Sequence, residues 1–158
     1  MSQIVNIKIL SGIPGCGKST WARDYVAKTR NVIRINRDDL RHILVEDFNS
    51  EGNESIINKS KLALIKTAIE FDRNIVLDDT HCYKDYLIFL IDFIRKAGEE
   101  FNKTTEIEIL DFDVDVDTCV ERNGKRERSI PTTAIYHMIS QKKEIIYSEL
   151  QVDTYIKM

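Results

Sequence analysis

Eight residues near the start of the chain, Gly12–Ser19, have the types and spacing G-x-x-x-x-G-K-S. Glycines let the backbone turn and come close to an anion, so that successive N–H groups point at a β-phosphate from the start of the next helix. Lys18 would neutralise β- and γ-phosphate oxygens, and the Ser19 hydroxyl would bind Mg²⁺. An apolar run precedes the pattern and a helical pattern follows it, as a phosphate-binding loop requires. The sequence therefore predicts binding of a nucleoside triphosphate.

A second group, Asn36–Arg41 (NRDDLR), follows the next apolar run. Acids are favoured in the first turn of a helix, so capping alone explains one aspartate well and two adequately. Capping does not explain Arg41, a cation beside the positive end of the same helix. Because residues three apart share a helix face, Asp38 could accept a hydroxyl proton while Arg41 held a substrate phosphate.

A third group, Asp78-Asp79-Thr80-His81, follows another apolar run. An aspartate at the end of the strand beside the phosphate loop commonly lies near the metal or near an arginine that faces the substrate. A solvated turn is the alternative. His81 is expected to be a loop residue and not a base or a metal ligand. No second His or Cys stands at ligand spacing from the other histidines.

A fourth group, Arg122–Pro131, carries four cations in residues 122–128 and is bracketed by Gly124 and Pro131. A run of charges is usually only a solvated helix face. Phosphoryl transfer spreads negative charge over equatorial oxygens, however, and arginines on a closing lid stabilise that charge. With a phosphate loop upstream, the pattern favours a lid over residues 122–131.

Four aspartates alternate with other residues at 111, 113, 115 and 117 and could suggest calcium binding. The glycine and the terminal glutamate of an EF-hand are missing at the required offsets. We expect instead a solvated edge strand that runs into helix-capping acids.

The composition of the 158 residues is that of a soluble globular chain, with 42% hydrophobic and 31% charged residues. The length fits one domain, residues 1–158. The net charge of −3 excludes a bulk attraction to nucleic acid or anionic membrane, so a polyanion would need a local basic patch. No apolar run approaches the roughly 18 residues of a membrane span. The first residues, MSQIVNIKILSG, lack the basic region and small-residue cleavage site of a secretory signal, so none is expected. Three scattered cysteines fit a reducing cytoplasm.

Strand-like and helix-like segments alternate along the chain, which predicts an α/β fold with a mainly parallel sheet of about four to five strands and helices on both faces. Ligands then bind beyond the carboxyl ends of the strands. The expected strands are Ile4–Leu10, Val32–Ile35, Ile75–Leu77 and Ile107–Phe112. The expected helices are Trp21–Lys28, Asp38–Val45, Ile56–Phe71, Tyr83–Ala97, Val116–Arg122 and Thr132–Leu150.

With these motifs assembled, the chain resembles the kinase domain of the bacteriophage 5′-polynucleotide kinases, within the P-loop kinase group. The matching residues are GIPGCGKSTW at Gly12–Trp21, NRDDLR at Asn36–Arg41, Asp79-Thr80, and Arg122-Asn123 through Arg126 to Ile130-Pro131. The NRDDxR pattern is the most specific of these, because a phosphate loop alone does not select a substrate. The resemblance implies a P-loop kinase fold and transfer of the ATP γ-phosphate to the 5′-hydroxyl of DNA or RNA, with Mg²⁺.

The resemblance also implies a role for each matched residue. Asp38 would activate the 5′-hydroxyl, Arg41 would bind the 3′-phosphate of the acceptor, Asp79 and Thr80 would shape the acceptor site, and Ile130 would pack on an acceptor base. Lys18, Asp38, Arg41 and Arg126 form the expected catalytic set, with Ser19 on the metal. The donor ATP would be held by Gly12, Gly15, Cys16, Gly17, Lys18, Ser19, Thr20, Arg122 and Arg126.

Two positions and the length of the lid depart from the family pattern. Cys16 stands where serine is usual, His81 stands where asparagine is found, and the shorter lid leaves the role of Arg128 open. No phosphatase domain follows the kinase motifs, so we expect kinase activity without 3′-phosphatase activity, in the cytoplasm (of the host, if the protein is phage-encoded). Relatives can self-associate, and an apolar face on Tyr83–Ala97 would be compatible with a homo-oligomer.

Two other functions remain open on the sequence. A small-molecule kinase with a nucleoside, sugar-acid or antibiotic acceptor is mildly favoured by the negative net charge. Against it, Arg41 beside Asp38 suggests an acceptor that carries its own phosphate. A nucleotide switch or binding module is disfavoured because no N-K-x-D motif for guanine is present.

Overall fold

The sheet has five parallel strands in the order β2-β3-β1-β4-β5 in the computed structural model, which describes residues 2–45 and 51–158. The strands are β1 (Ile4–Ser11), β2 (Val32–Ile35), β3 (Asn74–Asp78), β4 (Thr104–Asp111) and β5 (Thr154–Lys157). The helices are α1 (Lys18–Lys28), α2 (Arg37–Leu44), α3 (Glu51–Glu70), α4 (Lys84–Glu100), α5 (Val116–Gly124) and α6 (Thr132–Lys142), with a 3₁₀ turn at Tyr147–Glu149. The predicted α/β fold is confirmed.

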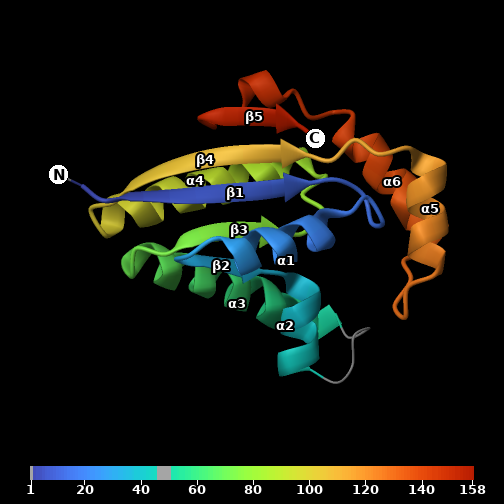
Figure 1. Ribbon diagram of the computed structural model, residues 1–158, viewed down its shortest axis with the longest axis horizontal. Coiled ribbons are helices and arrows are strands. Elements are labelled where there is room, and N and C mark those ends of the chain that lie inside the picture. The colour runs from blue at the N-terminus through green and yellow to red at the C-terminus, as the bar shows by residue number, and fades with distance from the viewer. Residues whose placement is uncertain (1, 46–50) are drawn as a thin grey trace.

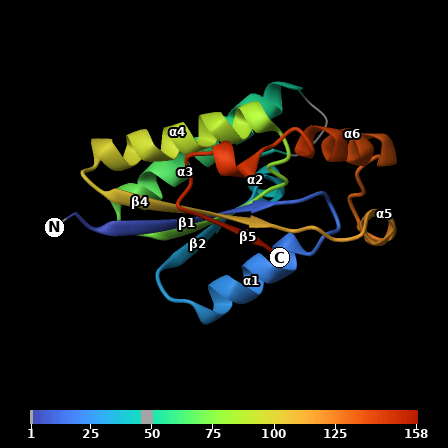
Figure 2. The same cartoon turned by 90° about the horizontal axis from the view of Figure 1, so that it is seen from above.

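Helices cover both faces of the sheet, as expected. α3 and α4 lie on one face and α1 lies on the other (Figure 2). Alternate residues of β1, such as Val5, Ile7 and Ile9, are fully buried in the core that also includes Leu90 of α4 and Ile65 of α3. A second core cluster joins the ends of β1, β3 and β4 to α1, α5 and α6. None of the helices in the described residues is long and apolar enough to cross a bilayer.

The last part of the chain differs from the prediction. A single helix was expected over Thr132–Leu150, but α6 ends at Lys142, and a 3₁₀ turn and the edge strand β5 follow. β5 has only four residues, all of them exposed, and so short a segment gives too little periodicity to predict a strand. Ile145 continued the helical pattern of α6, yet it lies beyond the end of that helix and is buried in the first core cluster.

The aspartate run after β4 was also misjudged in part. β4 lies between β1 and β5 and is not an edge strand, and Asp111 is buried. Asp111 accepts a hydrogen bond of 2.5 Å from the hydroxyl of Tyr155 on β5 and forms an ion pair with Lys142. Asp115 does cap α5, where its carboxylate accepts from the backbone N–H of Thr118 at 2.9 Å. The prediction of capping acids is therefore confirmed for this residue.

The carboxyl ends of the parallel strands lie at one edge of the sheet, and α5 and α6 stand beyond the ends of β1 and β4 (Figure 1). The phosphate-loop motif follows β1, the NRDDLR motif follows β2, and the Asp78–His81 group ends β3. β3 lies between β1 and β2, so the three groups are neighbours in space. On α4, Ile88 and Phe89 are 47% and 48% exposed, and the predicted self-association there stays a prediction.

Candidate active site

The loop between β1 and α1 has the backbone of a phosphate cradle. Gly15 and Gly17 have φ of 85° and 94°, which side chains other than glycine rarely adopt. Gly17 occupies the N-cap of α1, and no side chain caps this end of the helix. The first N–H groups of α1 therefore point out of the helix without a side-chain partner, which is the arrangement that binds phosphate.

Lys18 lies across this loop. Its side chain is 7% exposed, and its Nζ donates to the backbone carbonyls of Gly12 at 2.7 Å and Ile13 at 2.9 Å. Cys16 is buried, with its Sγ 3.3 Å from the same nitrogen. Thr20 is exposed in the first turn of α1. The cation is thus held within the loop that would cradle the donor phosphates.

Ser19 and Asp78 form a pair of oxygen ligands that suits Mg²⁺. Ser19 Oγ donates to Asp78 Oδ1 at 3.2 Å, and hydroxyl and carboxylate oxygens are the donors that Mg²⁺ takes in phosphoryl-transfer sites. The part of the chain that the structure describes has no group of three or more His, Cys, Asp or Glu side chains that could hold a metal ion. The residues fit a Mg²⁺ ion that completes its shell with phosphate and water oxygens.

The sequence analysis expected an aspartate near the metal at the end of this strand but assigned only Asp79 to the site, whereas Asp78 is the residue that contacts Ser19. Asp78 is 1% exposed, and Arg34 of β2 donates to its Oδ2 at 2.7 Å. Arg34 also pairs with Asp39. Burial disfavours the charge on Arg34, but the two carboxylates outweigh this and raise the pKa of the guanidinium. Arg34 stands alone as a charged residue in the short apolar strand β2, and the sequence analysis did not identify it as the partner of a buried carboxylate.

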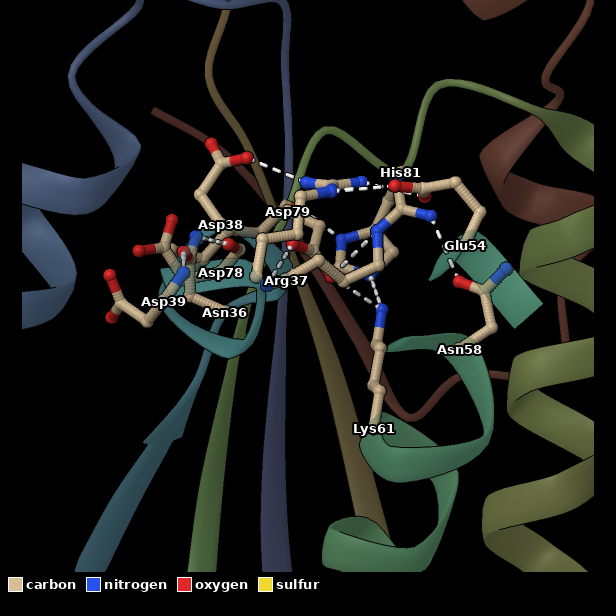
Figure 3. A network of polar contacts seen from close by, with 12 residues as sticks. Asn36, Arg37, Asp38, Asp39, Glu54, Asn58, Lys61, Asp78, Asp79 and His81 are labelled. Atoms are coloured by element: carbon tan, nitrogen blue, oxygen red, sulfur yellow. Dashed lines mark hydrogen bonds and ion pairs between the residues drawn. The ribbon is translucent and has the colours of Figure 1, made fainter. Parts of the chain in front are cut away.

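The start of α2 is fastened to the end of β3. Asn36 caps the helix by accepting from Asp39 N at 2.9 Å, and its Nδ2 donates to the carbonyl of Asp78 at 2.5 Å. Asp79 Oδ1 accepts from the backbone N–H of Arg37 at 2.9 Å. These contacts place Asp38 at the same strand ends as the phosphate loop (Figure 3).

Three arginines meet the Asp38 carboxylate. Oδ1 accepts from Nη1 of Arg41 at 2.6 Å and from Nη1 of Arg128 at 2.5 Å, while Arg126 Nη2 lies 3.8 Å from Oδ2. Asp38 comes from α2, whereas Arg126 and Arg128 come from the predicted lid. The structure therefore brings together the expected acid–base pair and the lid, and it gives Arg128 a place beside the acid.

Arg41 also holds a partner that sequence analysis missed. Its Nε and Nη2 donate to both oxygens of Glu54 on α3, at 2.7 Å and 2.8 Å. This hydrogen-bonded fork raises the pKa of Arg41 and lowers the pKa of Glu54. With Asp38 on Nη1, three of the five N–H donors of the guanidinium are engaged. Glu54 lies 13 residues from Arg41 in the sequence, so no local pattern indicated the pair.

The predicted lid residues do not all face the same partner. Arg122 reaches the phosphate loop, with Nη1 3.5 Å from the carbonyl of Gly15. Ile130 packs partly buried against the second core cluster, and both of its backbone polar groups bond to the Asn123 side chain. A contact between Ile130 and an acceptor base stays a prediction.

Thr80 and His81 lie under the phosphate loop. The Thr80 carbonyl accepts from Gly12 N at 2.9 Å, and the His81 carbonyl accepts from Ser11 Oγ at 3.1 Å. His81 is indeed a loop residue, as expected, but it is only 3% exposed. Burial and the ammonium of Lys61 lower the pKa of His81 to about 3.

The low pKa of His81 predicts a loss of stability in mild acid. The unfolded chain takes up a proton near pH 6.5 that the folded chain refuses until about pH 3, so this stability is lost as the pH falls below 6.5. This difference in proton uptake lowers the free energy of unfolding by about 2 kcal/mol between pH 7 and pH 5. Urea unfolding at the two pH values measures it. In His81→Asn the difference should largely vanish, and an unchanged difference would contradict the assignment.

Gly15→Ala should strongly destabilise the fold. An added Cβ would overlap the backbone carbonyl of Cys119, and the φ of 85° is strained for alanine. We expect a loss of about 3 kcal/mol in the free energy of unfolding. Gly124→Ala is the matched control, because a Cβ there meets nothing within 4 Å and the residue is helical. It should be neutral or stabilising by up to about 1 kcal/mol. Equal melting temperatures for the two variants would refute the close approach.

The five-stranded parallel sheet and the loop between β1 and α1 define the class of P-loop kinase folds. The chain belongs to the AAA_33 family, described as an AAA domain, which matches residues 7–144.

Three individual proteins are similar to this chain. The L-seryl-tRNA(Sec) kinase of Methanococcus maripaludis is 25% identical over 135 residues, which are 82% of this chain and 49% of that protein. A chain of the Pnkp1/Rnl/Hen1 RNA repair complex is 26% identical with a TM-score of 0.71, over 90% of this chain and 45% of the other. A fungal RNA kinase, at 15% identity and a TM-score of 0.72 over 99% of this chain and 75% of its own, shares the fold. The chain spans about half the length of the first two.

Proposed function

We propose that the protein is an ATP-dependent kinase that phosphorylates the 5′-hydroxyl end of a polynucleotide. The observation that carries the proposal is the position of Asp78. It lies between the donor side of the site, at Ser19, and the acceptor side, at the start of α2. Its carboxylate contacts Ser19 on the donor side, and its carbonyl contacts Asn36, the cap of the helix that carries Asp38. A hydroxyl beside Asp38 and a γ-phosphate beside Ser19 would therefore be neighbours.

The residues support in-line transfer in which the protein supplies positioning and charge. Lys18 and the N–H groups of the loop would hold the donor phosphates. Ser19 and Asp78 would hold Mg²⁺, which would neutralise phosphate charge. Asp38 accepts the proton of the attacking hydroxyl. Arg126 stabilises the charge of the transferred phosphoryl group from the lid, and Arg122 lies on the donor side.

The nucleic-acid acceptor is supported by the site and by two relatives. Arg37, Arg41, Arg126 and Arg128 gather around Asp38 and Glu54, which gives a local cationic cluster on a chain of net charge −3. Such a cluster suits an acceptor that carries phosphate. The seryl-tRNA kinase and the RNA repair complex both involve RNA by name. Asp79, Thr80 and Ile130 would complete the acceptor site.

A panel of acceptors tests the proposal. Transfer of labelled γ-phosphate from ATP with Mg²⁺ is measured to 5′-hydroxyl DNA and RNA oligonucleotides, free nucleosides, sugars and seryl-tRNA. Labelling of oligonucleotide 5′ ends supports the proposal. Labelling of nucleosides or sugars alone would replace it with a small-molecule kinase. ATP binding without transfer to any acceptor would indicate a nucleotide-binding module.

Arg41→Ala should weaken acceptors with a 3′-phosphate more than those without one. We expect KM to rise at least about tenfold for a nucleoside 3′-phosphate and to change little for the bare nucleoside, because a phosphate is a bidentate partner for arginine. Glu54→Gln should lower KM for the phosphorylated acceptor, since it removes a carboxylate that occupies the Arg41 fork. Steady-state kinetics with the two acceptors measure both effects. Equal losses for both acceptors in Arg41→Ala would make Arg41 a structural residue.

A small-molecule kinase is the second candidate. The fork of Arg41 is already filled by Glu54, so an acceptor without a phosphate would leave that ion pair intact. The negative net charge also favours it mildly. The acceptor panel separates the two functions directly.

A further inference from the structure

A buried network of polar contacts connects β1, the strand that leads into the phosphate loop, to the acceptor helix α2 (Figure 3). Its centre is Lys61 of α3, which is 0% exposed. The Nζ of Lys61 donates to Asp79 Oδ2 at 2.7 Å and to His81 Nε2 at 3.0 Å. A buried lysine is costly unless it is paired, so its presence needs an explanation beyond packing.

One arm of the network runs to the end of β1. His81 Nδ1 lies 2.6 Å from the carbonyl of Leu10 near the end of β1. Because a carbonyl only accepts, Nδ1 carries the proton, and Nε2 is left to accept from Lys61. The ring of Tyr86 lies parallel to His81, with centroids 6.4 Å apart, and Lys61 Nζ lies 5.2 Å from that ring. His81 also has φ of 44°, a conformation that the surrounding contacts must hold.

The other arm runs to the acceptor helix. Asp79 receives Lys61 on Oδ2 and the backbone N–H of Arg37 on Oδ1, at 2.9 Å. The Asp79 side chain is 8% exposed, and its two oxygens are taken up by the Lys61 ammonium and the Arg37 amide. The carboxylate therefore fixes the first residue of α2, immediately before Asp38.

We infer that Lys61 is a positioning residue for phosphoryl transfer: through His81 and Asp79 it fixes the Asp38 helix relative to the strand that ends in the phosphate loop. The inference rests on the proposed role of Asp38 as the base. Lys61 touches neither donor nor acceptor. It acts on the distance between the two halves of the site, to which transfer rates are sensitive.

Lys61→Met tests this role. Lys66→Met on the same helix is the control, since the Lys66 side chain is 43% exposed and forms a surface ion pair with Glu100. We expect kcat to fall at least about tenfold in Lys61→Met, while KM for ATP changes less than about threefold. Lys66→Met should leave both unchanged. A kcat equal to that of the wild type in folded Lys61→Met, measured well below its melting temperature, would overturn the inference.

A double variant covers the case in which Lys61→Met does not fold. Lys61→Met/Asp79→Asn removes the buried charge with its partner, and the amide oxygen of the new asparagine can still accept from Arg37 N–H. We expect it to fold and to keep kcat at least about threefold below the wild type, because the arm through His81 is lost. Wild-type kcat in this variant would equally overturn the inference.

Two magnetic-resonance measurements test the network without any acceptor. The wild type should show His81 as the neutral Nδ1–H tautomer and an Arg37 amide protected from hydrogen exchange. In Lys61→Met, the protection of the Arg37 amide should fall at least about tenfold, while Lys66→Met retains it. If oligonucleotides are not phosphorylated but these signals behave as expected, the proposed function fails and the network stands. Unchanged protection of Arg37 without Lys61 would refute the network itself.

Discussion

Asp38→Asn should abolish transfer while leaving ATP binding intact. General-base catalysis contributes about 10²-fold to 10⁴-fold, so kcat should fall at least about 10²-fold. The amide has nearly the shape of the carboxylate but cannot take the proton of the attacking hydroxyl. Donor binding should persist because the contacts of Asp38 are to Arg41, Arg126 and Arg128 and not to the phosphate loop. Single-turnover transfer and ATP titration measure the two quantities.

The control for this variant is Asp24→Asn. Asp24 is a surface acid of α1 that pairs with Lys28 four residues later, and surface pairs contribute little. Its transfer rate should equal that of the wild type. Near-normal turnover of Asp38→Asn would remove Asp38 as the base and leave it a partner that only orders the lid arginines.

Lys18→Met should lower the rate of transfer by about 10²-fold to 10³-fold. This is the usual loss when a hydrogen-bond donor that stabilises developing charge is removed. The ammonium lies within the loop at 2.7 Å from the Gly12 carbonyl. Arg122 reaches the loop only through an exposed side chain at 3.5 Å from the Gly15 carbonyl, so it is poorly placed to substitute. A rate measurement with saturating ATP and acceptor tests the expectation.

Lys28→Met at the far end of α1 is the matched control, since the Lys28 side chain is 73% exposed and forms a surface pair with Asp24. Its kcat should not change. Thermal unfolding of both variants separates a lost charge from a disturbed loop. A fall of less than tenfold in a folded Lys18→Met would show that the loop amides and Mg²⁺ suffice.

The local chemistry of the site was predictable from the sequence, because it depends on spacing along a single segment. The phosphate loop needs glycines at set offsets, and Gly15 and Gly17 indeed adopt positive φ. The pair Asp38 and Arg41 shares a helix face because three residues make almost one turn, and the two side chains touch at 2.6 Å. Alternating strands and helices likewise predicted a parallel sheet and the edge at which these groups meet.

Only the tertiary structure decided which partners these residues have. Glu54 on Arg41, Arg34 on Asp78 and Lys61 on Asp79 join different elements, and periodicity carries no information about such contacts. The edge strand β5 escaped prediction because pairing with β4, not apolar burial, makes it a strand. Sequence therefore determined the parts that one backbone segment builds alone. The tertiary structure determined which charged side chains pair with these residues, because neighbouring parallel strands and their crossover helices come from distant parts of the chain.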